Sequence, residues 1–223
     1  MLSRLSSSLH KSIGSNQEPR KEFNHFMDNN QNKEPIIKNK ILVALVAFGK
    51  TSSEKITRSL NTLKVDYRIV LPDEIPTFEP THIILSGGPK HVYEEDHPHL
   101  PKWVIESKCP VLGICYGMQL IAYTFGGNVI KMPQKEEGPV EVTEMINNTQ
   151  TTYVRWMNRY DRVTSIPNTF YVTAVTNDDH LAAFTDHNKW WAIQYHPESS
   201  KHGDLNVFRR FLGRRRQPHP PIS

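Results

Sequence analysis

The segment Val111-Leu112-Gly113-Ile114-Cys115-Tyr116-Gly117-Met118-Gln119 predicts a buried strand that passes through one cysteine directly into a helix. Its first four residues form the apolar run of a short strand, and the helix is expected over 116–125. Gly113 and Gly117 flank Cys115 in a G-x-C-x-G pattern, the thiol counterpart of a nucleophile elbow, because a Cβ at either glycine would clash with backbone at the sharp turn. The positive end of the helix favours a thiolate at Cys115. A buried structural cysteine explains these nine residues equally well.

Upstream of this segment, apolar strands alternate with helices. The continuous apolar run 41–46 is typical of a central parallel strand buried on both faces. Further strands are expected at 67–70 and 81–85, and helices at 53–63 and 100–107. This alternation predicts an α/β fold with an open, mostly parallel sheet, flanking helices and right-handed crossovers.

Downstream of Gly127 the pattern changes to short strands with tight connections. They predict hairpins and a meander, which form a small antiparallel portion in the C-terminal half of the chain. The expected strands lie at 129–130, 140–142, 153–156, 171–175, 181–184 and 190–195. A closing helix is expected over 205–212, with Gly213 as the residue that ends it.

Composition divides the 223 residues into three parts. Residues 1–40 carry seven basic and four acidic residues and few periodic apolar ones, which predicts a disordered or targeting extension. Residues 41–212 are expected to form one domain with a sizeable core. Residues 213–223 are expected to form a basic, proline-rich tail in which Arg214–Arg216 are solvated. The formal net charge of +4 comes from the two ends, so the fold lacks the clustered basic surface of a nucleic-acid-binding protein.

The two cysteines, Cys109 and Cys115, are separated by a predicted strand, which argues against a disulfide and suits a reducing compartment. No apolar stretch reaches the length of a membrane span. These features predict a cytoplasmic protein without a membrane partner.

The first seventeen residues lack acids and carry spaced leucines among serines. They resemble a mitochondrial transit peptide, so a mitochondrial location is the alternative.

A second group of candidate residues follows the last predicted strand. A cysteine nucleophile needs a base within hydrogen-bond reach, and the base needs a third group that orients it. His196 can be this base and Glu198 the orienting carboxylate, with Pro197 stiffening the connection between them. The alternative for His196, one of eleven histidines, is a surface or structural role. No cysteine or carboxylate array accompanies His97-Pro98-His99, so neither a metal site nor a cofactor is predicted.

A third feature is Leu85-Ser86-Gly87-Gly88-Pro89, which lies at the end of a predicted strand. In open parallel sheets, sites form beyond the carboxyl ends of the strands. A Gly-Gly turn there can cradle a phosphate or stabilise an oxyanion. No Lys-Ser/Thr follows at P-loop spacing, so the favoured interpretation is an oxyanion hole between the N–H groups of Gly88 and Tyr116.

The three motifs SGGP (86–89), GICYGMQ (113–119) and QYHPE (194–198) together resemble a class I, triad-type glutamine amidotransferase over about 41–212. Within that family they are most similar to the glutaminase part of GMP synthetase. The resemblance implies a catalytic triad of Cys115, His196 and Glu198. It implies an oxyanion hole formed by Gly88 and Tyr116, and contacts with glutamine from Gly87 and Gln119. It also implies that glutamine is hydrolysed to glutamate and ammonia through a thioester. The ammonia would pass to a separate synthetase, such as the ATP-pyrophosphatase subunit of GMP synthetase.

Three segments depart from the GMP synthetase pattern. Asn158-Arg159-Tyr160-Asp161 stands where that pattern has Ser-His-Gly-Asp, Lys135-Glu136-Glu137-Gly138 lacks an aromatic residue, and the turn 47–51 lacks the usual Asp and Gln. In the family these segments line the substrate pocket or face the synthetase domain. Two alternatives therefore stay open: a stand-alone γ-glutamyl hydrolase or peptidase on the same fold, and a catalytically slow regulatory protein.

Overall fold

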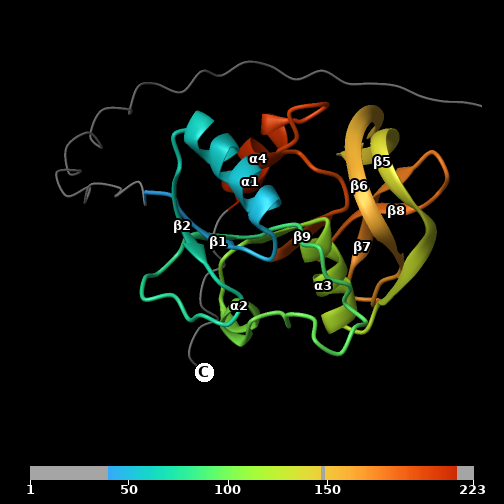
Figure 1. Ribbon diagram of the computed structural model, residues 1–223. Helices are drawn as coiled ribbons and strands as arrows, with labels where there is room; N and C mark the ends of the chain where they lie inside the picture. Colours follow the sequence, from blue (N-terminus) through green and yellow to red (C-terminus); the bar gives the residue numbers. More distant parts are fainter. Residues whose placement is uncertain (1–39, 147–148, 215–223) are drawn as a thin grey trace, which may run out of the picture. The chain divides into compact units, whose positions relative to one another are not determined.

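Figure 1 shows the computed structural model, which describes residues 40–146 and 149–214. Residues 1–39 of the predicted extension, including its transit-peptide-like segment, lie outside the described residues, and so does the predicted tail from residue 215 onward. Within the described part of the chain, no helix is both long enough and apolar enough to cross a membrane.

Five strands form the parallel half of the sheet, in the order β2-β1-β3-β4-β9. They are β1 (Leu42–Val46), β2 (Asp66–Val70), β3 (His82–Leu85), β4 (Val111–Ile114) and β9 (Trp190–Ile193). All residues of β3 and β4 are buried, because this half of the sheet is covered on both faces. The predicted α/β fold with a parallel sheet is confirmed, and the carboxyl ends of β1, β3, β4 and β9 meet at one edge.

The helices of the described residues divide between the two faces of the sheet (Figure 1). They are α1 (Lys50–Thr62), α2 (Lys102–Glu106), α3 (Tyr116–Thr124) and α4 (Leu205–Leu212). In β1, Val43 and Leu45 join the core that includes residues of α1 and α4, whereas Ala44 and Val46 join the core that includes residues of α2 and α3. This division follows from the alternation of side chains across a strand.

Beyond β9 the same sheet continues with antiparallel strands, in the order β8-β7-β5-β6. They are β5 (Asn128–Ile146), β6 (Thr149–Ser165), β7 (Tyr171–Thr176) and β8 (Leu181–Thr185). The predicted antiparallel portion thus extends the parallel half into one nine-stranded sheet.

The structure contradicts the short strands predicted at 129–130, 140–142 and 153–156. β5 and β6 are instead the two long strands of one hairpin, with 19 and 17 residues. Pro133 and Pro139 interrupt the apolar pattern of β5, and proline is usually excluded from central strands. Here the register shifts between Lys131 and Glu136, and β7 pairs only with residues 142–144 of β5. Both prolines therefore lie where β5 has at most one neighbouring strand.

α4 ends at Gly213 as predicted, and one detail after it differs from the prediction. Gly213 has φ −76° and so closes the helix in a right-handed conformation, not in the left-handed one common at that position. Arg214, predicted to begin a solvated tail, contacts the domain instead. Its carbonyl oxygen lies 2.9 Å from His82 Nε2, and its guanidinium donates to the carbonyl oxygen of Asn188 at 3.0 Å.

Candidate active site

The strand-to-helix turn predicted at Cys115 joins β4 to α3. Cys115 has φ 53°, in the left-handed region that non-glycine residues seldom adopt, and it is 6% exposed. The residues two positions before and after Cys115, Gly113 and Gly117, have no room for a side chain. A Cβ on Gly113 would lie 2.7 Å from the carbonyl oxygen of Gly117, and one on Gly117 would lie 2.5 Å from that of Leu85. The turn thus holds the sulfur on strained backbone, which costs about 1–3 kcal/mol and persists only where the surroundings enforce it.

The loop after β9 brings a histidine and a carboxylate to the same edge of the sheet. β4 and β9 are parallel neighbours, so Cys115 and His196, which follow them, lie together. His196 Nδ1 is 2.7 Å from Glu198 Oε1, and the backbone N–H of His196 donates to the carbonyl oxygen of Trp156 at 2.9 Å. The side chains of His196 and Glu198 are 14% and 0% exposed. The imidazole therefore has a fixed orientation in a largely dry environment.

Ser52, in the first turn of α1, is a site residue that the sequence analysis missed. Its hydroxyl donates to Glu198 Oε1 at 3.0 Å and accepts from the N–H of Gly87 at 3.1 Å. Ser52 thereby links the carboxylate to the Ser86–Pro89 turn. The one signal in the sequence is its place just after the first parallel strand, whose carboxyl end lies at the edge where sites form.

The charge of His196 is set by two opposing effects. Burial lowers the pKa of His196, but the Glu198 carboxylate and the Cys115 thiolate raise it by more, so the pKa lies well above its ordinary value. Nδ1 is engaged by Glu198, and Cys115 is the other group that interacts with the ring.

We expect Glu198→Gln to lower the pKa of His196, because the substitution removes the carboxylate that favours the imidazolium. A histidine whose pKa is higher in the folded than in the unfolded protein stabilises the folded state when it is protonated. This stabilisation is fully present below about pH 6.5, the pKa of histidine in the unfolded chain, and is lost as the pH rises through the pKa in the folded state. The free energy of unfolding should therefore decrease more above pH 6.5 in the wild type than in Glu198→Gln. NMR titration of the His196 ring and urea unfolding at several pH values measure the two effects. Identical titration curves for the two proteins would contradict the assignment.

Six of the seven predicted site residues line one cavity of about 510 Å³, namely Gly87, Gly88, Cys115, Gln119, His196 and Glu198. The side chain of Gln119 is buried, and its Nε2 donates to the carbonyl oxygen of Asp161 at 3.3 Å. A volume of this size is typical of small-molecule sites. Within residues 40–146 and 149–214, no group of three or more histidine, cysteine or acidic side chains is placed to hold a metal ion.

Tyr116, the seventh predicted residue, takes part only through its backbone. Its ring is buried and packs against Phe48, with the ring centroids 5.3 Å apart. As the first residue of α3, it has an N–H without a partner inside the helix. The N–H of Gly88 also has no acceptor within the described residues. Both N–H groups are therefore free to donate to a ligand.

The segment 158–161, which departs from the GMP synthetase pattern, forms part of the cavity wall. Asp161 is buried, and its carboxylate lies 2.6 Å from His91 Nδ1 and accepts from the Tyr93 hydroxyl at 2.8 Å. Burial first, and then this carboxylate, raise the pKa of Tyr93 to about 12. On the same strand, Arg159 Nε donates to Glu136 Oε2 at 2.6 Å. The departing segments 158–161 and 135–138 are thus tied to each other, and 158–161 is also tied to the chain that follows Gly88.

Comparison with known proteins identifies the family. The family model "Glutamine amidotransferase class-I" matches residues 44–213. A GMP synthase of Brachyspira hyodysenteriae is 40% identical over 168 residues, which cover 70% of this chain and 32% of the relative. A GMP synthase of Thermotoga petrophila is 38% identical over 173 residues, 74% of this chain and 34% of the relative. The chain thus spans about one third of the length of these curated relatives.

Solved structures agree with the family in fold. A candidate GMP synthase subunit from Thermoplasma acidophilum has a TM-score of 0.70 and 27% identity, covering 78% of this chain and 93% of that chain. A glutamine amidotransferase of Thermotoga maritima has a TM-score of 0.61 at 19% identity, over 72% of this chain and 77% of that one, and supports the fold alone. The predicted resemblance is confirmed: the chain belongs to the class-I glutamine amidotransferase family.

Proposed function

We propose that this chain hydrolyses the side-chain amide of glutamine to glutamate and ammonia, with Cys115, His196 and Glu198 as its catalytic triad. One observation carries the proposal: the 2.7 Å contact between His196 Nδ1 and Glu198 Oε1 lies in the same cavity as Cys115. A thiol beside an oriented base is the arrangement that activates a cysteine nucleophile. Membership of the family supports glutamine as the substrate.

In the first half of the reaction, Cys115 Sγ attacks the amide carbon of glutamine and the carbonyl electrons move onto oxygen. The N–H groups of Gly88 and Tyr116 donate to this oxyanion, and one such donor is typically worth about 3 kcal/mol in the transition state. His196 gives a proton to the amide nitrogen as the C–N bond breaks. Ammonia leaves, and Cys115 carries a γ-glutamyl thioester.

In the second half, water completes the hydrolysis. His196 takes a proton from a water molecule, the resulting hydroxide attacks the thioester carbon, and glutamate leaves as the thiolate returns to Cys115. Glu198 holds Nδ1–H and stabilises the imidazolium in both halves. Gly87 and Gln119, on the wall of the same cavity, are the proposed contacts of glutamine.

The proposed recipient of the ammonia is a separate synthetase subunit. The curated relatives are GMP synthases of which this chain spans about one third, and a solved relative is described as one subunit of such a synthase. These names support an ATP-pyrophosphatase subunit of GMP synthetase as the partner.

We also propose the cytoplasm as the compartment, with the mitochondrion as alternative. The location of a reporter protein fused to residues 1–25 distinguishes the two compartments.

The function is tested by measuring glutamate release from glutamine by the purified chain, alone and with a GMP synthetase ATP-pyrophosphatase subunit plus its nucleotide substrates. We expect glutamate release, and GMP formation from glutamine only when both proteins are present. Glutamate release without any GMP formation would contradict the proposed partner. No release of glutamate under either condition would contradict the glutaminase function itself.

A γ-glutamyl hydrolase or peptidase is the second candidate. The cavity of about 510 Å³ is large enough for a drug-sized ligand, and its wall includes the departing segment 158–161. A γ-glutamyl peptide could therefore occupy it beyond the glutamyl part. A kcat/KM for γ-glutamyl peptides above that for glutamine would establish this second function.

Ser52→Ala should lower kcat for glutamine hydrolysis about tenfold while the protein stays folded. The substitution removes one hydrogen bond to the Glu198 carboxylate and leaves the Gly87 N–H without its partner, losses of about 1–3 kcal/mol each. Steady-state kinetics and a melting curve measure the effect. Ser53→Ala is the matched control, since the Ser53 hydroxyl is buried and has no hydrogen-bond partner among the described residues. Equal kcat values for the two variants would exclude a positioning role for Ser52.

A further inference from the structure

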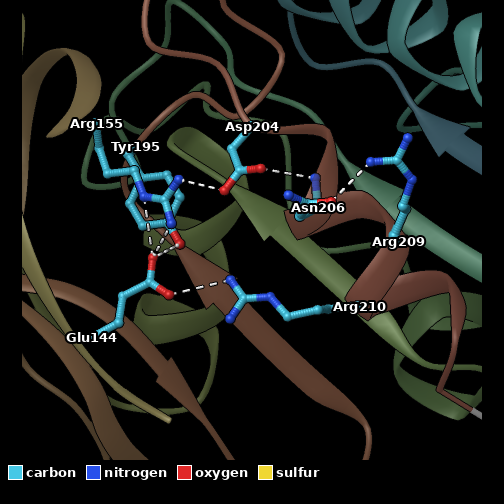
Figure 2. A network of polar contacts seen from close by, with 7 residues as sticks. All are labelled: Glu144, Arg155, Tyr195, Asp204, Asn206, Arg209 and Arg210. Atoms are coloured by element: carbon cyan, nitrogen blue, oxygen red, sulfur yellow. Dashed lines mark hydrogen bonds and ion pairs between the residues drawn. The ribbon is translucent and has the colours of Figure 1, made fainter. Parts of the chain in front are cut away.

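A buried polar network outside the proposed triad surrounds Glu144 on β5 (Figure 2). Glu144 Oε1 accepts from Arg155 Nε at 3.2 Å, from Arg155 Nη2 at 2.7 Å and from the Tyr195 hydroxyl at 2.8 Å. Glu144 Oε2 accepts from Arg210 Nη2 at 3.2 Å. The side chains of Glu144 and Arg155 are 6% and 4% exposed, so this ion pair lies almost entirely out of water.

The guanidinium of Arg155 also reaches a second carboxylate. Arg155 Nη1 donates to Asp204 Oδ2 at 2.7 Å (Figure 2). Asp204 caps α4 by accepting from the N–H of Asn206 at 2.9 Å, and its own N–H donates to the carbonyl oxygen of Pro197 at 2.9 Å. Arg155 on β6 therefore connects to the start of α4 and, through Asp204, to the residue after His196.

These contacts hold both ends of the loop 195–204, which carries His196 and Glu198. Tyr195, at the start of the loop, is bound to Glu144, and Asp204, at its end, is bound to Arg155. Between them, the N–H of His196 donates to the backbone of Trp156, the residue after Arg155.

Packing and polar contacts both hold this loop on the side of Glu144, where Tyr195 is 1% exposed and belongs to an apolar core. A cavity of about 380 Å³ is lined there by Glu144, Tyr195 and Arg210, among others. Packing fixes the Tyr195 ring, whereas the hydrogen bond to Glu144 beside this cavity fixes the direction of its hydroxyl. The planar fork of an arginine fixes such directions better than any apolar side chain.

A buried ion pair is weak evidence for a role in stability, because well-packed apolar residues of similar volume often stabilise a protein as much or more. Unlike apolar residues, however, the ion pair of Glu144 and Arg155 also fixes the geometry of the groups that it binds. We infer that Arg155 and Glu144 are positioning residues, which hold the loop 195–204 so that His196 stays aligned with Cys115. The inference rests on the proposed triad, and neither residue lines the cavity that contains Cys115.

The first test compares Arg155→Met with Arg209→Met. Arg209 is the matched control because it lies on α4 in the same network but, among the residues that the structure describes, donates only to Asn206, at 2.8 Å (Figure 2). We expect Arg155→Met to lower kcat for glutamine hydrolysis about 10- to 100-fold, the range for a displaced catalytic group, with KM nearly unchanged. Arg155→Lys, which keeps the charge but not the fork, should recover only part of the loss. Arg209→Met should match the wild type.

The second test does not require turnover of glutamine. Alkylation of Cys115 by iodoacetamide is followed from pH 5 to 10, because an imidazolium beside the sulfur keeps the thiol reactive at low pH. We expect the curve of Arg155→Met to shift to higher pH and that of Arg209→Met to coincide with the wild type. If the wild type alkylates as expected but releases no glutamate, the proposed function fails while this inference stands.

A purely structural role would give a different result. It would lower the melting temperature of Arg155→Met and leave kcat and the alkylation curve unchanged, and this outcome would overturn the inference. If Arg155→Met does not fold, Tyr195→Phe carries the test, since it removes only the hydroxyl that binds Glu144. A folded Tyr195→Phe with a lower kcat and the same shift in alkylation supports the inference, and one with wild-type behaviour overturns it.

Discussion

Replacing Cys115 by serine should lower glutamine hydrolysis by at least about 10³-fold, the largest effect expected of any single substitution in this chain. The serine hydroxyl is a much weaker acid than a thiol and its oxygen is smaller than sulfur. It therefore does not replace the sulfur as the nucleophile beside His196. The fold should not change, because Cys115 contributes only a small buried side chain. Glutamate release in a coupled assay and a melting curve measure the two quantities. Substantial release by Cys115→Ser would refute the triad.

An electrophile that mimics glutamine should label Cys115 and spare Cys109. Cys115 lines the cavity of about 510 Å³. Cys109 is 1% exposed, and its thiol donates to the carbonyl oxygen of Pro80 at 2.9 Å. Peptide mapping by mass spectrometry after labelling locates the adduct. Labelling of both cysteines to the same extent would show that the elbow confers no special reactivity.

Gly117→Ala should destabilise the protein by about 3 kcal/mol or more, the second large effect. Its Cβ would lie 2.5 Å from the carbonyl oxygen of Leu85 and 2.8 Å from the Leu85 Cβ. Both are on β3, a central strand with little freedom to move, so overpacking here exceeds the usual cost of about 1–3 kcal/mol. Denaturant unfolding monitored by circular dichroism gives the difference in the free energy of unfolding.

Gly213→Ala is the control for this substitution. Gly213 has φ −76°, and the nearest atom to its Cβ would be the carbonyl oxygen of Arg209 at 3.5 Å. Alanine fits there without strain and reduces the freedom of the unfolded chain, so it should stabilise the protein by about 0.4–1 kcal/mol. Equal losses of stability at Gly117 and Gly213 would contradict the steric account of the elbow.

Local sequence patterns predicted β1, β2, β3 and β4 of the parallel half, but the strand expected at 190–195 within the antiparallel portion is β9, which pairs in parallel with β4. The bounds of β4 and the start of α3 follow from an apolar run, two glycines and a cysteine, all within nine residues. The contact between His196 and Glu198 was also predictable, because the two residues are close in sequence and follow a strand. Features of this kind depend on neighbours along the chain, which a sequence displays directly.

Features that depend on distant partners were not predictable in the same way. The length of β5 depends on its pairing with β6, which compensates for Pro133 and Pro139. Ser52 belongs to the site only because the fold places the start of α1 against the loop after β9, where Ser52 binds Glu198. The pairing of Glu144 with Arg155 likewise requires that β5 and β6 pair as a hairpin. A lone serine or charged residue carries no sign of such a contact in the sequence.

The position of β9 has a consequence for how the protein becomes active. β9 is the last strand in sequence among the described residues, yet it lies between β4 and β8 in the middle of the sheet. Until it inserts, the nascent chain presents β4 as an unprotected edge on which other chains can pair. The insertion closes a long loop, which slows folding. It also delivers His196 to Cys115, so the step that removes the aggregation hazard also completes the proposed triad.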